Sequence, residues 1–208
     1  MRTLNSNHPN TLTVQRDHPS AHSISKRWAL YFELSKARLS ALVVITTMTG
    51  FLLACQDSLD SWLFFWTTLG TACTAFGANS FNQWWELYRD SRMERTRKRP
   101  IPTGQITRRN AFFWAILVSA TGIAILSSKV NFLTAFLALS NILLYVLVYT
   151  PLKPISSLCT LVGAVCGAIP PMMGWTAVTG HLGYGAWLLG ATLFIWQIPH
   201  FLSLAWLY

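Results

Sequence analysis

Residues 61–90, "SWLFFWTTLGTACTAFGANSFNQWWELYRD", decide the fold of this chain. The part from 61 to 85 is apolar and aromatic, and it exceeds the roughly 20 residues that a helix needs to cross the hydrocarbon core of a bilayer. Gly70, Gly77 and the small residues around them favour close packing against other helices. Polar side chains follow, so the stretch predicts a membrane helix that carries its chemistry at one end.

The composition of the whole chain extends this prediction. Of its 208 residues, 52% are hydrophobic and 11% are charged, which is typical of a membrane protein and not of a soluble domain. We therefore expect an all-α fold, a polytopic bundle of transmembrane helices. About six spans are predicted, at residues 38–56, 61–85, 110–128, 131–150, 156–179 and 186–207.

The charged residues gather in loops on one side of these spans. The formal net charge is +9, but the basic residues do not form a face that follows a phosphate backbone, so nucleic acid is not an expected partner. Bases precede the first span and fill residues 86–109, whereas Asp57 and Asp60 lie in the first loop of the other side. The positive-inside rule therefore predicts a cytoplasmic N-terminus and a cytoplasmic 86–109 loop, or the equivalent side of an organelle membrane.

Residues 1–33 are expected to form a polar, disordered cytoplasmic tail, followed by a membrane domain over residues 34–208. The tail is rich in Ser, Asn and His, and it lacks the apolar core of a cleaved signal peptide. This favours a multi-pass protein of a bacterial inner (cytoplasmic) membrane. A mitochondrial transit peptide, and with it the mitochondrial inner membrane, stays open as the alternative.

Asn82, Glu86 and Asp90 follow one another at a spacing of four residues. On a helix they project from one face, each about 6 Å along the axis from the last. Carboxylate and amide oxygens suit Mg²⁺, which bridges carboxylates to substrate phosphates. We therefore expect these three residues to hold the metal of a magnesium diphosphate and to be catalytic. The alternative is a solvated helix end in which the acids only pair with Arg89 or Arg92.

Basic residues come directly after these acids and end in the turn-forming stretch "RPIPTG". Arg95 and Arg99, together with Lys98, are the predicted ligands of the diphosphate. On the same side, "YTPLKP" supplies Lys153 and Tyr149 as further candidates. A purely topological role of these bases is the other interpretation.

The fifth predicted span contains Gly163 and Gly167 at GxxxG spacing, followed by Pro170 and Pro171. Two prolines inside a span predict a break or a kink. Broken membrane helices are tolerated where the freed backbone groups face a cavity, so we expect a central cavity inside the bundle. A kink that serves packing alone is the alternative.

The last predicted span contains "WQIPHF", with Trp196, Gln197 and His200 in mid-membrane. Polar groups at this depth are candidates for function. An imidazole and an amide among large apolar side chains suit a flat, metal-bearing ring, so these three residues are the predicted haem-binding set. A hydrogen-bonded core histidine is the alternative.

Three stretches together resemble one family: "NQWWELYRDSRMERTRKRPIPTG", "YTPLKPISSLCTLVGAVCGAIPPMMGW" and "WQIPHFLSLAW". They are similar to the protohaem IX farnesyltransferases, or haem O synthases, within the UbiA-type intramembrane prenyltransferases. The resemblance implies a bundle of nine transmembrane helices around a central cavity. It also implies a second acidic segment beyond Tyr208, so the chain is expected to be truncated at its C-terminus.

The same resemblance implies an activity. A farnesyl group passes from farnesyl diphosphate to a vinyl group of haem B with addition of water, which gives haem O, and Mg²⁺ assists. A haem A synthase or a terminal oxidase would then be a partner in the bilayer. Two alternatives remain open: prenylation of an aromatic quinone precursor, and a non-enzymatic haem-binding or transport protein.

Overall fold

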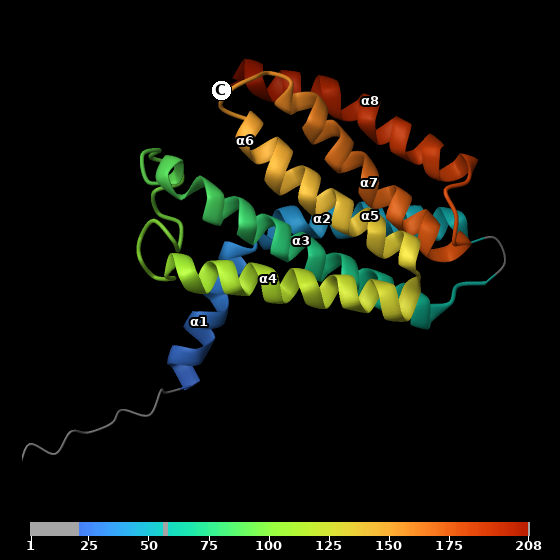
Figure 1. Ribbon diagram of the computed structural model, residues 1–208, viewed down its shortest axis with the longest axis horizontal. Coiled ribbons are helices and arrows are strands. Elements are labelled where there is room, and N and C mark those ends of the chain that lie inside the picture. Colours follow the sequence, from blue (N-terminus) through green and yellow to red (C-terminus); the bar gives the residue numbers. More distant parts are fainter. Residues whose placement is uncertain (1–20, 56–57, 208) are drawn as a thin grey trace, which may run out of the picture.

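A computed structural model describes residues 21–55 and 58–207 of the chain, and these residues are helical apart from short connections. Figure 1 shows long helices that lie side by side, with the shorter α1 projecting from one end of the bundle. The helices are α1 (Ala21–Leu34), α2 (Ala37–Ala54), α3 (Ser61–Asp90), α4 (Arg108–Ile125), η1 (Leu126–Val130), α5 (Phe132–Leu143), η2 (Leu144–Tyr149), α6 (Thr150–Leu152), α7 (Cys159–Thr179) and α8 (Tyr184–Leu207), where η marks π-helical turns.

Within the described residues, five helical segments are long and apolar enough to cross a membrane. They begin at residues 37, 108, 132, 159 and 184, and they match five of the predicted spans. The remaining prediction, 61–85, lies in α3, which is 30 residues long but is not among the five. Many polar residues of α3 are buried against its neighbours, which gives this helix a protein environment in place of lipid.

Side chains of the connecting segments fix where several helices begin. The Asp60 carboxylate accepts hydrogen bonds from two backbone N–H groups at the start of α3, and the Thr107 hydroxyl accepts one at the start of α4. Asn131 does the same for α5. At the other end of α7, Gly180 adopts a φ of 71°, a left-handed conformation that ends helices and that glycine takes without strain.

Helices α2 and α7 touch through their backbones. A Cβ atom added at Gly50 of α2 would collide with the carbonyl oxygen of Pro171, and one added at Gly174 of α7 would collide with the carbonyl oxygen of Thr47. Absence of a side chain at both glycines is what allows this approach. The GxxxG pair behaves differently, since Gly163 and Gly167 make room for side chains of Tyr149 and Gln197.

The expected break in the fifth span does not occur. Helix α7 is continuous from Cys159 to Thr179, with Pro170 and Pro171 inside it. The break is therefore excluded, and the kink, the other outcome that the prolines predict, stays a prediction. Prolines lack a backbone N–H, yet neighbouring helices can compensate for a lost bond inside a membrane bundle. Both prolines are buried here, and Pro171 lies on the contact with α2.

Part of the predicted N-terminal tail is ordered. Helix α1 spans Ala21–Leu34, which corrects the expectation of disorder for residues 21–33. Its end is buried: Leu34 packs with Ile101 and Ile106, and Tyr31 lies against Trp114. These contacts bury apolar side chains and stabilise the helix. The polar composition of residues 1–33 as a whole gave no indication of them. Residues 1–20 of the predicted tail lie outside the described residues.

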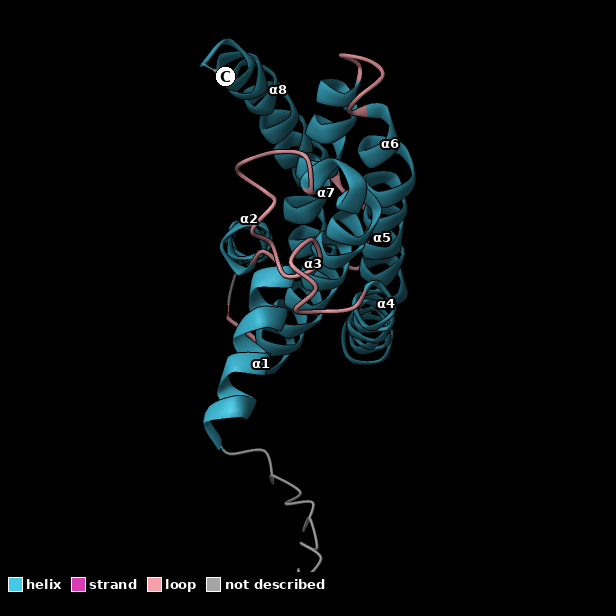
Figure 2. Cartoon of the chain, turned by 90° about the vertical axis from the view of Figure 1, so that its left-hand side faces the viewer, coloured by secondary structure: helices cyan, strands magenta, loops and turns pink. Residues whose placement is uncertain are grey.

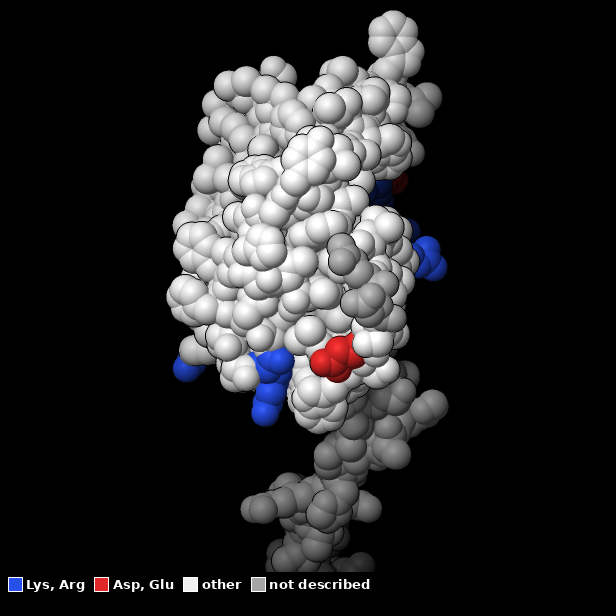
Figure 3. Space-filling model, turned by 90° about the vertical axis from the view of Figure 1, so that its right-hand side faces the viewer, with Lys and Arg blue, Asp and Glu red and all other residues white. Residues whose placement is uncertain are grey.

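The two ends of the bundle differ in charge. Figure 2 views the end at which α2 and α4 begin and α3 ends, where the long loop 91–107 lies beside α1. Most of the described charged residues belong to this end. Figure 3 shows the opposite end as a largely uncharged surface. We refer to these as the charged end and the uncharged end.

Candidate active site at the charged end of the bundle

Asn82, Glu86 and Asp90 lie on the last turns of α3 and form one buried row, here named the polar stripe. Their exposed fractions are 2%, 5% and 4%. Buried carboxylates at successive helical turns are costly unless partners compensate their charge. The stripe is therefore a specialised arrangement and not a solvated helix end.

Each member of the polar stripe has a basic partner, and each partner comes from a different segment. Lys153, between α6 and α7, places its Nζ 3.2 Å from Oε1 of Glu86. Arg99, in the loop 91–107, places its NH1 2.5 Å from Oδ2 of Asp90. Lys153, predicted as a ligand of the diphosphate, therefore lies beside the acids, and its binding of a diphosphate stays a prediction.

The loop that carries Arg99 is held by apolar and backbone contacts. Ile101 and Ile106 are 5% exposed and pack with Leu34 of α1. The Thr96 hydroxyl donates to the Asp90 carbonyl oxygen, and Gly104 adopts a φ of 74° at the turn. Arg99 is therefore fixed on the stripe by the fold of its own loop.

Lys36 is a site residue that the sequence analysis missed. Its Nζ donates to Oδ1 of Asn82 at 2.5 Å, and the Asn82 amide donates in turn to the Thr150 hydroxyl at 3.2 Å. Burial lowers the pKa of the Lys36 ammonium to about 8; Arg99 acts in the same direction, while Glu86 opposes it. Lys36 directly precedes the first span, so its sequence position indicated only a topological anchor.

The turn between α1 and α2 aims Lys36 at the stripe. Lys36 has a φ of 47°, the one positive value at a non-glycine residue in the described chain. Such a conformation is sparsely populated and persists where the surroundings impose it. Here the Gln83 amide of α3 donates to the carbonyl oxygens of Glu33 and Leu34, which holds the end of α1 on the same helix that carries the stripe.

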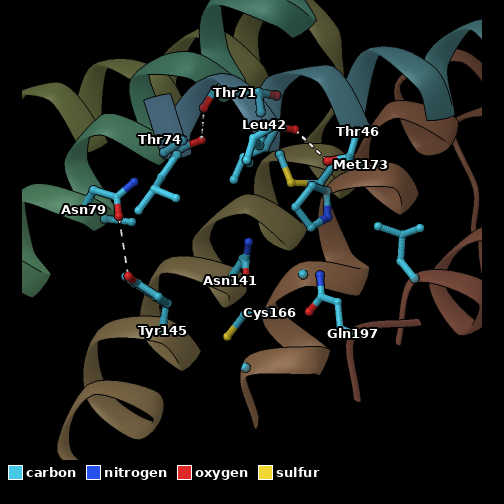
Figure 4. Close-up of a pocket in the computed structure, with 18 of the residues that line it drawn as sticks. Leu42, Thr46, Thr71, Thr74, Asn79, Asn141, Tyr145, Cys166, Met173 and Gln197 are labelled. Atoms are coloured by element: carbon cyan, nitrogen blue, oxygen red, sulfur yellow. Dashed lines mark hydrogen bonds between the residues drawn. The ribbon is translucent and has the colours of Figure 1, made fainter. Parts of the chain in front are cut away.

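A cavity of about 550 Å³ opens inside the bundle beside the polar stripe. Helices α2, α3, α5, η2, α7 and α8 line it, and most of the lining is apolar (Figure 4). Asn79, one turn before Asn82 on α3, and Tyr145 of η2 are both on its wall, with the Tyr145 hydroxyl 3.4 Å from Oδ1 of Asn79. The expected central cavity is therefore present, although α7 is unbroken.

Trp196, Gln197 and His200 of α8 line this same cavity. The rings of Trp196 and His200 are stacked, with centroids 5.0 Å apart and planes 12° from parallel. These three residues therefore line the same cavity as Asn79, which lies one turn before the polar stripe on α3. That the three bind haem stays a prediction.

Other predicted ligands of a diphosphate lie farther from the stripe. Arg95 and Lys98 are exposed, and neither contacts an acid of the stripe in the described structure. Tyr149 stacks on Tyr145, with ring centroids 5.2 Å apart. Arg99 and Lys153 are therefore the predicted bases that the fold places on the acids, and the roles of Arg95, Lys98 and Tyr149 stay predictions.

Comparison with known proteins agrees with this geometry. The model of the UbiA prenyltransferase family matches residues 43–208, which include the polar stripe and all of the cavity wall except Leu39 and Leu42. The chain belongs to this family. It is 48% identical to a mitochondrial protoheme IX farnesyltransferase of Arabidopsis thaliana, over 84% of this chain and 41% of that protein.

Further relatives of this UbiA family member carry the same name. A mitochondrial protoheme IX farnesyltransferase of Homo sapiens is 51% identical over 83% of this chain and 39% of its own length. One from Koribacter versatilis is 42% identical over 86% of this chain and 58% of its own length. The chain therefore spans about half the length, or less, of these relatives.

A solved structure shares the fold of the chain. A digeranylgeranylglyceryl phosphate synthase superposes with a TM-score of 0.70 at 16% sequence identity, over 83% of this chain and 59% of that one. At this identity the likeness concerns the arrangement of helices alone. It confirms the predicted all-α bundle of a UbiA-type membrane protein.

The carboxylate oxygens of the polar stripe fit a hard divalent cation, whereas Oδ1 of Asn82 already accepts a hydrogen bond from Lys36. Lys153 and Arg89 approach the same oxygen of Glu86, and Arg99 approaches one oxygen of Asp90. Among the described residues no donor occupies Oε2 of Glu86 or Oδ1 of Asp90. Two buried carboxylates with one unoccupied oxygen each form the kind of donor set that Mg²⁺ shares with substrate phosphates.

Proposed function

We propose that this protein transfers the farnesyl group of farnesyl diphosphate to a vinyl group of protohaem IX (haem B), with addition of water, to give haem O. The observation that carries the proposal is that Asn79, one turn before the polar stripe on α3, lines the same apolar cavity as Trp196 and His200. Relatives named protoheme IX farnesyltransferase, similar over most of this chain, support the same substrate class.

The site separates the two parts of a prenyl diphosphate. Lys36, Arg99 and Lys153 bring three positive charges to two carboxylates, which leaves an excess that favours an anionic headgroup. The cavity beside them is lined mainly by apolar side chains and suits the hydrocarbon tail. In this arrangement the diphosphate lies at the charged end and the tail runs into the bundle.

The bases of the site would promote cleavage of the allylic C–O bond. As that bond breaks, its electron pair stays on the diphosphate oxygen, and positively charged donors placed there in advance stabilise the developing charge. Mg²⁺ bound to Asn82, Glu86 and Asp90 would add charge neutralisation of the leaving group. The Lys36, Arg99 and Lys153 side chains would hold the diphosphate and keep it from recombining with the farnesyl carbon.

The wall formed by α8 would hold the acceptor. The stacked rings of Trp196 and His200 present aromatic surface to the cavity, which suits a flat porphyrin and stabilises a nearby carbocation. The haem vinyl group then donates its π electrons to the farnesyl cation. Trp196 lines the cavity, whereas Trp84 lies under the Arg108 guanidinium.

The membrane placement follows the asymmetry of charge. The charged end would face the cytoplasm in a bacterium, or the equivalent side of the mitochondrial inner membrane. Farnesyl diphosphate would reach the polar stripe from that side. A haem A synthase or a terminal oxidase would receive the product, and such a partner remains part of this proposal.

The experiment expresses the protein in cells without their own haem farnesyltransferase and analyses the extracted haems by chromatography and mass spectrometry. We expect haem O. Unchanged haem B in membranes that contain the inserted protein would contradict the transferase, and haem B retained on the purified protein would favour haem binding without catalysis. A prenylated aromatic acid in the same extract would instead identify a quinone pathway.

A further inference from the structure

Three buried oxygen atoms on the cavity wall have no hydrogen-bond partner among the described residues. They are the side-chain oxygens Oγ1 of Thr71 on α3, Oδ1 of Asn141 on α5 and Oε1 of Gln197 on α8. A buried acceptor without a donor loses its hydration and gains nothing in return, so native proteins rarely leave one unpaired. Three of them around one cavity indicate a ligand that brings donors.

The two amides are held by the packing of their helices. Gln197 occupies the space above Gly167 of α7, where any Cβ atom would collide with its amide. Figure 4 shows the Asn141 and Gln197 side chains inside the cavity, reached from α5 and α8 respectively. The sequence predicts Gln197 as a haem-binding residue, and no local pattern points to Asn141.

The proposed substrates do not satisfy these acceptors. A farnesyl chain has no hydrogen-bond donor, and neither has the vinyl edge of a haem. A water molecule has two O–H donors, and buried waters typically bind two to four polar groups of the protein. The Asn141 and Gln197 amide oxygens are unpaired acceptors of that kind on the wall of one cavity, and the Thr71 hydroxyl is a third unpaired group on it.

We propose that Asn141 and Gln197 bind the water molecule that is added to the haem vinyl group, an inference that rests on the proposed function. The outer vinyl carbon bonds to C1 of the farnesyl cation and leaves a cation on the inner vinyl carbon. The water oxygen bonds to that inner carbon. Each amide oxygen accepts a hydrogen bond from one O–H group of the water. The lone pairs of the water oxygen therefore remain directed at the carbocation.

The proton released by the added water goes to the departed diphosphate, which is a base at neutral pH. Polar groups extend from the water site toward it: Tyr145 lies one turn from Asn141, its hydroxyl donates to Asn79, and Asn79 lies one turn from Asn82. The sum of the steps consumes farnesyl diphosphate, haem B and water and yields haem O and protonated diphosphate. No oxidant or reductant is needed.

The first test examines how the product is distributed. In Asn141→Leu the cation has no positioned water and loses a proton instead, so we expect a farnesylated haem lighter than haem O by one water molecule. Gln197→Met is expected to act in the same direction, and Asn141→Gln to restore part of the hydroxylated product. Asn110→Leu, at an exposed amide of α4, is the matched control.

The second test does not depend on turnover. The purified protein is titrated with protohaem and with its analogue in which hydroxyethyl groups replace the vinyls. We expect tighter binding of the hydroxyethyl haem by about tenfold, equivalent to one additional hydrogen bond, and loss of this preference in Asn141→Leu. Equal preference in the wild type and in the variant would overturn the proposal.

The outcomes separate the two proposals. If the wild type makes no farnesylated haem, the proposed function fails, and the binding titration still decides whether Asn141 recognises a hydroxyl group. If the wild type makes haem O and Asn141→Leu makes haem O in the same proportion, the proposed function stands and the water site is rejected. Hydroxyl oxygen derived from ¹⁸O-labelled water in the wild type identifies water as the added molecule.

Discussion

At the scale of the residue, the central fact is that acids and bases of the polar stripe come from separate segments. Glu86 and Asp90 belong to one helix, while their partners lie in the segment between α6 and α7 and in the loop 91–107. Removal of one partner from a buried pair leaves an uncompensated charge, which costs about 3–5 kcal/mol. These ion pairs keep the site stable while no substrate is bound. A substrate with its own charges would then replace one partner of each pair.

Glu86→Gln and Asp90→Asn should each lower haem O formation by about a hundredfold or more. Mutation of a residue that only hydrogen-bonds to a metal ligand can already lower activity by about a hundredfold, and these two residues are the predicted ligands themselves. Both substitutions preserve side-chain volume. Product is measured in membranes adjusted to equal amounts of inserted protein. Glu94→Gln, which alters an exposed acid paired with Arg97, serves as the control; wild-type rates in both stripe variants would remove the stripe from the active site.

Lys36→Met should weaken binding of farnesyl diphosphate by about tenfold to a hundredfold, since hydrogen bonds to charged groups contribute about 1.5–3 kcal/mol. Calorimetric titration of the protein in nanodiscs measures the affinity. Arg38→Met, at an exposed base two residues later, is the matched control. An unchanged dissociation constant would assign Lys36 to the support of Asn82 alone.

The residues of the site were predictable to the extent that helical spacing governs them. Asn82, Glu86 and Asp90 share a face because four residues make slightly more than one helical turn. Arg99 and Lys153 were predicted from charge, and the fold does place them on the acids. Lys36 and Asn141 were not predicted, because their roles depend on which helices meet in space, and no local pattern carries that information.

At the scale of the element, the helices begin and end close to where hydropathy indicates. The span predicted at 131–150 corresponds to Phe132–Leu152, and the last span, predicted to begin at 186, begins at Tyr184. Local sequence fails where tertiary packing competes with propensity. Residues 21–33 are helical because the end of α1 is buried, and α7 continues through two prolines because its neighbours hold it.

Gly50→Ala should reduce the free energy of unfolding by about 1–3 kcal/mol, the usual cost of forcing extra volume into a packed interior. The new methyl group meets backbone atoms of Pro171, which cannot rotate away. Thermal unfolding in detergent measures the change. Gly163→Ala is the control, because its methyl group meets the Tyr149 ring, a side chain that can shift; equal losses in the two variants would contradict a backbone contact between α2 and α7.

At the scale of the whole molecule, the separation of charge between the two ends predicts how the chain is oriented in the membrane. The loop 91–107 and the uncharged-end segment 180–183 lie at opposite ends of the bundle (Figure 1). Bases near the ends of spans are retained on the cytoplasmic side during insertion. The orientation of the chain can therefore be tested independently of any activity.

Gln105→Cys and His181→Cys should react differently with a membrane-impermeant maleimide when bacterial cells that produce the protein are labelled intact. Position 181 should be labelled at once, and position 105 only after the cells are opened. Both residues are exposed. The background protein has its native cysteines replaced, at Cys55, Cys73, Cys159 and Cys166. Labelling in the reverse order would invert the proposed topology.

The backbone contact between α2 and α7 has a mechanical consequence for the cavity between them and α8. At Gly50, Pro171 and Gly174 the contact between α2 and α7 is made by backbone atoms, which cannot change rotamer as a side chain can. The two helices are therefore expected to move together as one rigid unit. Helix α8 instead contacts α7 at two points through flexible side chains. The Gln197 amide lies over Gly167, and the Met172 thioether lies over Gly190. We therefore expect α8 to be the wall of the cavity that shifts most readily when a flat ligand such as a porphyrin enters.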